Sequence, residues 1–238
     1  YDRIVWGTDE HKRQGRRALD KPVSAELGSV SPVAIVPGTY TDAELDFCAA
    51  QVVAMVTHNA SFNCTSTKVL VLADGWHQKE AFIRRVEAGL RRVPTRRAYY
   101  PGAHDRYAAL TEDRPSAERI GRTDGDRLPW TLVRGLDPSS TDERLFAVEP
   151  FCSVLSIVEL DVPDALVFVD EAVEFVNERL WGTLTAAWFV SESQRRLAPV
   201  RQAIEGSIGS LRYGVVGVNQ WPALAFAWAS PAWGGHPS

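Results

Sequence analysis

Residues 30–73, "VSPVAIVPGTYTDAELDFCAAQVVAMVTHNASFNCTSTKVLVLA", contain two apolar runs separated by a helical pattern. The first run, at 30–36, ends at Pro37-Gly38, which is typical of a strand followed by a turn. Thr41 and Glu44 form the sequence pattern of a capping box, so we expect a helix over 42–57. The second run, at 67–73, predicts another strand. This order predicts two parallel strands joined by a crossover helix.

The rest of the chain continues the alternation of strand-like and helix-like patterns. We expect helices over 79–92 and 170–180, a weaker helix interrupted by Pro199, and strands over 153–160, 184–190 and 214–219. Residues 111–140 are rich in Asp, Arg, Gly and Pro, and there we expect long, disordered surface connections around a short strand at 130–133. The predicted fold class is α/β, with a mostly parallel sheet flanked by helices.

Composition narrows the function classes. The chain has 238 residues, 45% of them hydrophobic, which indicates a soluble globular protein with a sizeable core. Its net charge of -4 argues against nucleic acid as a partner, and no apolar run approaches the roughly 20 residues that a membrane-spanning helix needs. The three cysteines form no CxxC pair, so we expect neither a disulfide framework nor a metal site. A reducing, cytoplasmic location follows.

Cys64 lies outside both flanking elements, on the connection between the helix at 42–57 and the strand at 67–73. On such a turn a thiol can face a cleft, and its backbone N–H can point at the group that the sulfur attacks. The alternative is an ordinary small residue in a tight connection. Cys48 differs, because it shares a helix face with Leu45 and Val52 and is therefore expected in the core.

Two carboxylates and one histidine are further candidates. Glu26 stands in a small and apolar stretch that would raise its pKa toward that of a general base, although a solvated glutamate at a strand end fits the same pattern. Glu149 and Phe151 combine an acceptor with an aromatic face, which suits ribose hydroxyls and a flat ring. His58 is six residues before Cys64, but the sequence shows no Asn or Asp to orient it in a Cys–His pair.

Six segments in order resemble the C-terminal catalytic half of the aldehyde dehydrogenase superfamily. They are "VWGT" (5–8), similar to the strand and turn Phe-Thr-Gly-Ser; "ELGSVSP" (26–32), similar to Glu-Leu-Gly-Gly-Lys-Ser-Pro; "SFNCTSTKVLV" (61–71), similar to Gly-Gln-x-Cys and its strand; "EPFCSVLSI" (149–157), similar to Glu-x-Phe-Gly-Pro-Val-Leu; "DEAVEFVNERLWGTLTAAWF" (170–189); and "VNQWPALAFAWASPAWGGHPS" (218–238). Together they span nearly the whole chain.

The resemblance implies a role for each candidate. Cys64 falls on the catalytic nucleophile, and Glu26 falls on the general base that activates the deacylating water. Glu149 falls on the residue that binds the nicotinamide ribose, with Phe151 beside the nicotinamide, and Gly7 and Thr8 fall on the turn near the cofactor pyrophosphate. The implied reaction is oxidation of a small-molecule aldehyde to an acid with NAD or NADP, through a thiohemiacetal and a thioester.

The sequence also departs from the family pattern. Phe62 replaces the Gln of Gly-Gln-x-Cys, Ser29 and Val30 replace Gly and Lys of the glutamate motif, Cys152 replaces a Gly, and Trp233 replaces a Phe. The resemblance implies that residues 1–27 are the last part of a dinucleotide-binding domain and that 28–238 are the catalytic domain. It implies a missing N-terminal cofactor-binding half, a homo-oligomer when that half is present, and no dehydrogenase activity of the chain alone.

Two other functions remain open from the sequence. One is a cofactor-free thiol hydrolase or acyl-transfer protein that uses Cys64 with Glu26 or His58. The other is a catalytically silent domain of the same fold, in which the departures near Cys64 have removed activity. Cofactor binding separates aldehyde oxidation from both, and thiol labelling separates the hydrolase from the silent domain.

Overall fold

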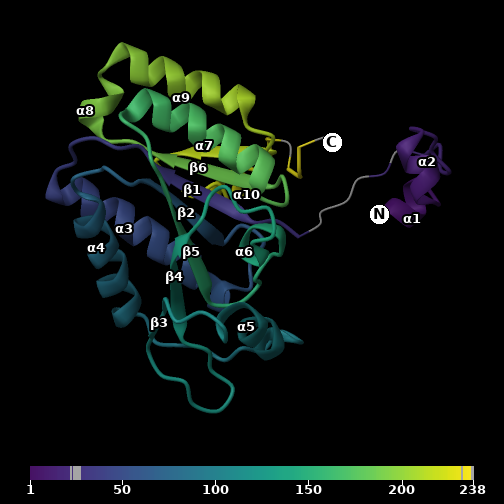
Figure 1. The fold of residues 1–238 in the computed structure, drawn as a ribbon, viewed down its shortest axis with the longest axis horizontal. Helices are drawn as coiled ribbons and strands as arrows, with labels where there is room; N and C mark the ends of the chain where they lie inside the picture. The colour runs from purple at the N-terminus through teal and green to yellow at the C-terminus, as the bar shows by residue number, and fades with distance from the viewer. Residues whose placement is uncertain (22, 24–27, 232, 237–238) are drawn as a thin grey trace.

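The computed structural model describes residues 1–21, 23, 28–231 and 233–236. Residues 28–236 contain a seven-stranded sheet with the strand order β3-β4-β5-β2-β1-β6-β7 (Figure 1). The strands are β1 (Ser31–Ile35), β2 (Thr67–Ala73), β3 (Ala117–Ile120), β4 (Trp130–Leu136), β5 (Val154–Leu160), β6 (Thr185–Phe189) and β7 (Val215–Val218). All neighbouring strands are parallel except β3 and β4. The α/β class and the mostly parallel sheet are confirmed.

Helices cover both faces of the sheet (Figure 1). The helices α3 (Asp42–Thr57) and α4 (Lys79–Arg92) pack together on one face, and α7 (Ala165–Arg179) and α9 (Ala198–Ser210) pack together on the other. The arrangement follows from right-handed crossovers: the chain moves from β1 to β2 in one direction but from β5 to β6 to β7 in the opposite direction, so the connecting helices lie on opposite faces.

The expected unit at residues 30–73 is confirmed in detail. The Thr41 side chain accepts from the Glu44 backbone N–H at 3.3 Å, and the Glu44 carboxylate accepts from the Thr41 backbone N–H at 2.7 Å, which completes the capping box of α3. Cys48 is 4% exposed on the inner face of this helix, and burial raises its pKa to about 12. Cys48 is therefore a core residue, as its periodicity predicts.

The expectation for residues 111–140 is wrong in part. The region forms β3 and β4, and α5 (Ala103–Thr111) precedes them. The strand β4 is longer than expected and lies between β3 and β5, with Trp130 only 1% exposed and its indole N–H donating to the Val93 carbonyl at 2.9 Å. Pairing with β5 fixes this strand, and a polar local composition does not reveal such non-local pairing.

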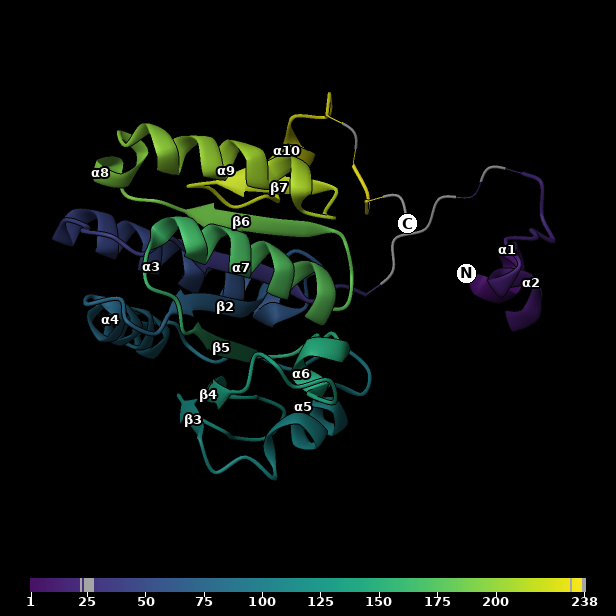
Figure 2. The same ribbon diagram turned by 45° about the horizontal axis from the view of Figure 1, so that its top comes forward.

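The N-terminal residues form α1 (Asp2–Val5) and α2 (Asp9–Arg13), which lie apart from the sheet in both views (Figure 1, Figure 2). The strand expected around Val5 is therefore wrong. The carbonyl of Val5 accepts from the backbone N–H groups of Ala18 and Leu19, and its own N–H donates to Tyr1, so the backbone bonds of this segment are satisfied locally rather than in a sheet.

Short helices complete the body: η1 (His58–Ser61), α6 (Arg144–Ala147), α8 (Glu192–Arg195) and α10 (Leu224–Ala227). Pro199 does not interrupt a helix, because it occupies the first turn of α9, where its missing N–H costs nothing. Among the described helices, none combines the length and apolarity that crossing a bilayer requires.

Candidate active site

The predicted site residues Cys64, Glu149 and Phe151 lie at one edge of the sheet, together with Gly28 and Trp181, which were not predicted as site residues. Gly28 precedes β1, Cys64 precedes β2, Glu149 and Phe151 precede β5, and Trp181 precedes β6. Because β1, β2, β5 and β6 run parallel, the starts of these strands meet at the same edge, which we call the amino edge. The sheet topology therefore gathers segments that are up to 153 positions apart in the sequence, from Gly28 to Trp181.

Cys64 is half-buried in a turn that is held from three sides. The Asn63 side-chain oxygen accepts from the backbone N–H and the hydroxyl of Thr65, both at 2.9 Å, and the Cys64 thiol lies 3.8 Å from the same oxygen. The Ser31 hydroxyl of β1 donates to the Cys64 carbonyl at 3.1 Å, and the Trp221 indole N–H donates to the Thr65 carbonyl at 3.0 Å. The thiol is thus placed by a fixed turn rather than by a helix or strand.

A left-handed segment leads into this turn. Asn59, Ala60 and Ser61 have φ of 51°, 55° and 68°, which is unfavourable for residues with a Cβ. Lys68 of β2 reaches back to this segment, and its ammonium donates to the Ser61 carbonyl at 2.9 Å and to the Ser61 hydroxyl at 3.0 Å. Three consecutive left-handed residues next to a candidate nucleophile are the kind of local strain that often marks a functional site.

Lys68 is completely buried beneath the amino edge. Burial lowers its pKa to about 8, and the nearby Cys152, Glu149 and Cys64 act in the opposite direction. Cys152 is also completely buried, and burial raises its pKa to about 11 although Lys68 and Arg106 oppose the shift. Cys152 is therefore a protonated core thiol at neutral pH, whereas Cys64 is the thiol of this edge that reaches the surface.

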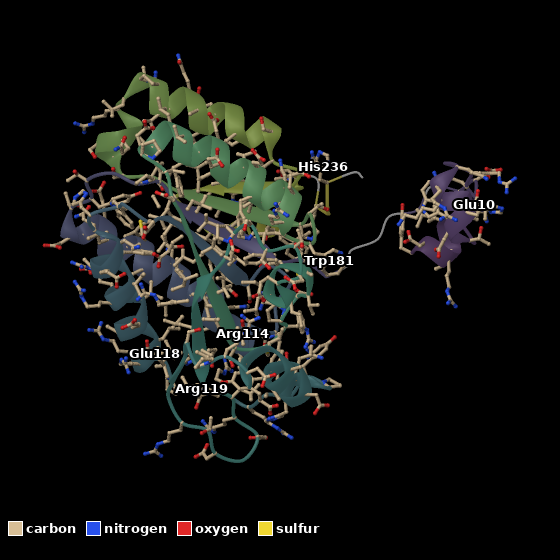
Figure 3. The ribbon with its side chains drawn as sticks, viewed as in Figure 1. Glu10, Arg114, Glu118, Arg119, Trp181 and His236 are labelled. Carbon is tan, nitrogen blue, oxygen red and sulfur yellow. The ribbon has the colours of Figure 1, made fainter. Side chains whose placement is uncertain are left out.

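A pocket of about 440 Å³ opens at the amino edge beside these residues. Its lining includes the two predicted cofactor-binding residues, Glu149 and Phe151, together with Gly28 and Trp181. A Cβ on Gly28 would lie 2.6 Å from the Trp181 ring and 2.9 Å from a Glu149 carboxylate oxygen, so a side chain at this position would displace one or both of them. Figure 3 shows Trp181 on the side of the body that faces α1 and α2, where Glu10 is labelled.

An aromatic cluster connects two lining residues of the pocket, Tyr100 and Phe151, with Phe62, which lies two residues before Cys64. Phe62 lies 5.9 Å from Phe151 and 5.8 Å from Tyr100, and Tyr100 lies 4.7 Å from Phe151, all between ring centroids. Arg106 packs over Tyr100 at 5.8 Å and donates to the Pro150 carbonyl at 3.2 Å. Phe62, which departs from the family pattern, therefore links the turn before β2 to the turn before β5.

The structure brings His58 to Asn63 rather than leaving it without an orienting side chain. The Asn63 nitrogen lies 3.0 Å from His58 Nδ1, and the Asn63 oxygen is already engaged by Thr65, so the amide donates and Nδ1 accepts. An orienting Asn in a Cys–His pair does the reverse: its side-chain oxygen accepts a hydrogen bond from one ring N–H of the histidine. The second ring nitrogen can then take the thiol proton. This contact therefore does not prepare His58 Nδ1 to act as the base for Cys64.

The remaining predicted site residues are separated from this edge or lie outside the described chain. Gly7, with φ of 78°, and Thr8, whose side chain caps α2 by accepting from the His11 N–H at 3.2 Å, belong to the separate N-terminal unit. Glu26 lies outside the described residues. The roles of Gly7, Thr8 and Glu26 stay predictions.

Sequence analysis missed Lys68, Tyr100, Arg106 and Trp181, which all contact or line this site. Lys68 sits inside an apolar strand pattern, and a single charge there is the signal that could have identified it. The other three residues carried no local signal, because they reach the pocket only through the fold.

The described residues contain no group of three or more His, Cys, Asp or Glu side chains that could hold a metal ion. The described side chains at the amino edge include a thiol, a carboxylate, aromatic faces and a buried ammonium.

No protein-family model matches the sequence, and no curated protein does. Solved structures do match. NADP-dependent glyceraldehyde-3-phosphate dehydrogenase from Bacillus halodurans C-125, complexed with NADP, is 19% identical with a TM-score of 0.67 and covers 89% of this chain and 42% of that one. NAD-dependent aldehyde dehydrogenase from Sinorhizobium meliloti is 23% identical with a TM-score of 0.61 and covers 89% of this chain and 40% of that one.

A third match is 1-pyrroline-5-carboxylate dehydrogenase from Thermus thermophilus, at 17% identity and a TM-score of 0.69, covering 88% of this chain and 39% of that one. The chain has the aldehyde dehydrogenase fold. It spans about two fifths of the length of the solved chains that it matches. The aldehyde dehydrogenase fold confirms the architecture that the six motifs imply, and the position of Cys64 within it is the basis for the function proposed below.

Proposed function

We propose that this chain is the catalytic part of an NAD(P)-dependent aldehyde dehydrogenase, which oxidises an aldehyde to a carboxylic acid through a thioester on Cys64. The observation that carries the proposal is the meeting of two features at the amino edge: a half-buried thiol on a fixed turn, and a pocket that pairs Glu149 with an aromatic wall. Residues 1–27 would belong to a dinucleotide-binding domain, and the complete protein would be a homo-oligomer.

Cys64 supplies the nucleophile. Its thiolate attacks the aldehyde carbon and forms a thiohemiacetal, and loss of hydride from that carbon leaves a thioester on the sulfur. In this proposal Glu26 then takes a proton from the water that attacks the thioester, which releases the carboxylic acid and the thiolate. The turn around Asn63 fixes the direction from which the sulfur meets the substrate, and such positioning is a large part of the rate gain in reactions of this kind.

The pocket fits the nicotinamide end of the cofactor. Glu149 can accept hydrogen bonds from ribose hydroxyls, Phe151 offers a ring face, and the absence of a side chain at Gly28 leaves room for the Trp181 ring beside the carboxylate. When bound, the nicotinamide supplies the acceptor for hydride. In this proposal Gly7 and Thr8, on the turn before α2, would lie near the pyrophosphate.

A thiol hydrolase is the second candidate, and the His58 contact weakens its Cys–His form. The Nδ1 atom that would take the Cys64 proton already accepts from Asn63. A hydrolase that uses Glu26 instead, and a silent domain, remain as outcomes of the test.

The test uses the polypeptide that carries this chain together with a dinucleotide-binding half. Rapid mixing with NAD(P)+ and a short aliphatic or an aromatic aldehyde should give a burst of NAD(P)H near one per site, followed by steady turnover. Cys64→Ser should abolish both phases, because a hydroxyl is a far poorer nucleophile at neutral pH than a thiolate.

Cys48→Ser is the matched control, since Cys48 is buried in α3 and has no place in the reaction. It should keep the burst and the turnover of the folded protein. A burst that survives Cys64→Ser would refute the proposal. Ester hydrolysis that depends on Cys64 but never on NAD(P)+ would replace it with the hydrolase, and a folded protein without either activity would replace it with the silent domain.

A further inference from the structure

Lys68 is a buried lysine that no step of the proposed reaction uses. Its relative exposure is 0%, and both of its hydrogen bonds end on the neutral oxygens of Ser61. Burying an ammonium is costly unless opposite charge or several strong acceptors compensate it. A core strand could hold an apolar residue at this position, so the charge points to a role at the edge that it underlies.

Three groups that become negative on ionisation surround Lys68: the thiols of Cys64 and Cys152 and the carboxyl of Glu149. Each of them raises the pKa of Lys68 against the effect of burial. Coulombic coupling is reciprocal, so the same ammonium favours the ionised form of each neighbour. Since the pKa of Lys68 is about 8, the ammonium is mostly charged at neutral pH.

The ammonium of Lys68 favours the ionised forms of its neighbours to different extents. Cys152 is completely buried, and its pKa stays at about 11 in spite of Lys68. Cys64 has part of its surface in solvent, so it carries a smaller burial penalty against which the ammonium must act. The ammonium also holds the left-handed Ser61 segment, which directly precedes Phe62 and the Cys64 turn.

We propose that Lys68 is a positioning residue for the reaction at Cys64: its ammonium holds the Ser61 segment that presents the thiol and favours the thiolate of Cys64 over that of Cys152. This inference rests on the proposed function for its purpose, but its physical content concerns the ionisation of Cys64 and needs neither aldehyde nor cofactor. A thiolate that is populated at neutral pH is what a nucleophilic cysteine requires.

The experiment measures iodoacetamide alkylation of each cysteine by peptide mapping across pH 6 to 10, on the 238-residue chain and three variants. Lys68→Met keeps the length and removes the charge. It should lower the Cys64 rate at neutral pH about tenfold and move the pH profile upward by about one unit. Lys68→Arg keeps the positive charge and should keep most of the Cys64 alkylation rate of the unaltered chain. If Lys68 acted only through its shape, the two variants would slow Cys64 alkylation equally.

Lys79→Met is the matched control, because Lys79 is also a buried lysine but lies beyond the opposite end of β2. Its Cys64 profile should coincide with that of the unaltered chain. Coincidence of the Lys68→Met profile with that of the unaltered chain, in a variant with unchanged circular dichroism, would overturn the inference. Equal slowing by Lys68→Met and Lys68→Arg would also overturn it, because shape rather than charge would then matter.

A second measurement covers the case in which Lys68→Met does not fold. By reciprocity, Cys64→Ala should lower the pKa of Lys68, which is followed by NMR of the lysine side-chain carbon next to the nitrogen, with Lys79 as the internal reference. An unchanged Lys68 titration would overturn the inference. The proposed function fails separately: a complete protein without NAD(P)+-dependent oxidation, but with the shifted Cys64 profile, would leave the Lys68 inference intact.

Discussion

Two buried lysines lie near opposite ends of β2 and have opposite surroundings. Lys68 follows the Cys64 turn at the amino edge and donates to neutral oxygens, and burial lowers its pKa to about 8. Lys79 begins α4 beyond the other end of the strand. Burial also acts to lower the pKa of Lys79, but hydrogen bonds to Asp74 and Glu159 outweigh it and raise the pKa.

Lys79 and its partners form a chain of ion pairs. Its ammonium contacts Asp74 at 2.5 Å and also contacts Glu159. Arg134 of β4 joins the network at 2.6 Å from Glu80 and 3.4 Å from Glu159. Two carboxylate partners raise the pKa of Lys79 and so favour its protonated form, whereas the pKa of Lys68 is lowered and its neighbours include thiols. The two ends of β2 therefore differ in electrostatics: carboxylates compensate the buried ammonium beyond the carboxyl end, whereas neutral oxygens and thiols surround the one at the amino edge.

The largest expected effect is on turnover, and it compares Glu26, a carboxylate of the proposed reaction, with Glu159, a carboxylate of the ionic network. In the complete enzyme, Glu26→Gln should lower steady-state turnover by about 10²- to 10⁴-fold, the usual cost of losing a general base, while the burst of NAD(P)H survives and the acyl-enzyme accumulates. Rapid-mixing absorbance measures both phases. Glu159→Gln is the matched control and should change the turnover of the folded protein little. Unchanged turnover of Glu26→Gln would remove Glu26 from the mechanism.

The next effect concerns stability and compares the two lysines directly. Lys79→Met should reduce the free energy of unfolding by about 2 kcal/mol, because it leaves Glu159 half-buried without its ammonium partner. Lys68→Met should change it less or increase it at neutral pH, since it removes a buried charge that has no carboxylate hydrogen-bond partner in the structure described. Urea unfolding followed by circular dichroism gives both values. A larger loss for Lys68→Met than for Lys79→Met would break the comparison.

The smallest effect is a pH dependence that belongs to Lys68. In the unfolded chain a lysine has a pKa near 10.4, and in the folded chain the pKa of Lys68 is about 8. Between these values the unfolded state binds more protons, so this group makes the free energy of unfolding rise with pH, by at most about 1.4 kcal/mol per pH unit. Below pH 8 the penalty of the buried charge is fully present.

Other buried groups make the free energy of unfolding fall with pH, so their contribution must be removed from the measurement. Burial raises the pKa of Cys48 to about 12 and that of Tyr213 well above its ordinary value, so these groups ionise first in the unfolded chain and lower stability as the solution becomes alkaline. The difference in unfolding free energy between the unaltered chain and Lys68→Met removes their contribution. That difference should move in favour of the unaltered chain from pH 8 to pH 10, and a flat difference would mean that Lys68 does not titrate there.

The elements with local signals were predictable. The helix α4 has the predicted bounds, and the capping box of α3 forms as its sequence pattern requires, because capping depends on residues three positions apart. The short strand expected at 130–133 is confirmed as the first part of β4, which extends to Leu136. The strand β3 was not predicted, because its four residues carry no clear alternation and only the folded chain pairs them with β4. The strand expected at Val5 does not form, because the backbone groups of this segment hydrogen-bond within residues 1–19.

The sequence by itself determined the α/β alternation, the core position of Cys48 and the location of Cys64 before a strand, because periodicity, capping and turn residues act over a few neighbours. Only the tertiary structure decided that Gly28, Glu149 and Trp181 meet, since strand order is a property of the sheet and not of any one strand. It also decided the pKa shifts of the two buried lysines: Lys68 and Lys79 are the same residue type, and their opposite shifts arise from what the fold places around them. Solvation and Coulombic energy depend on distance in space, which the order of residues along the chain does not specify.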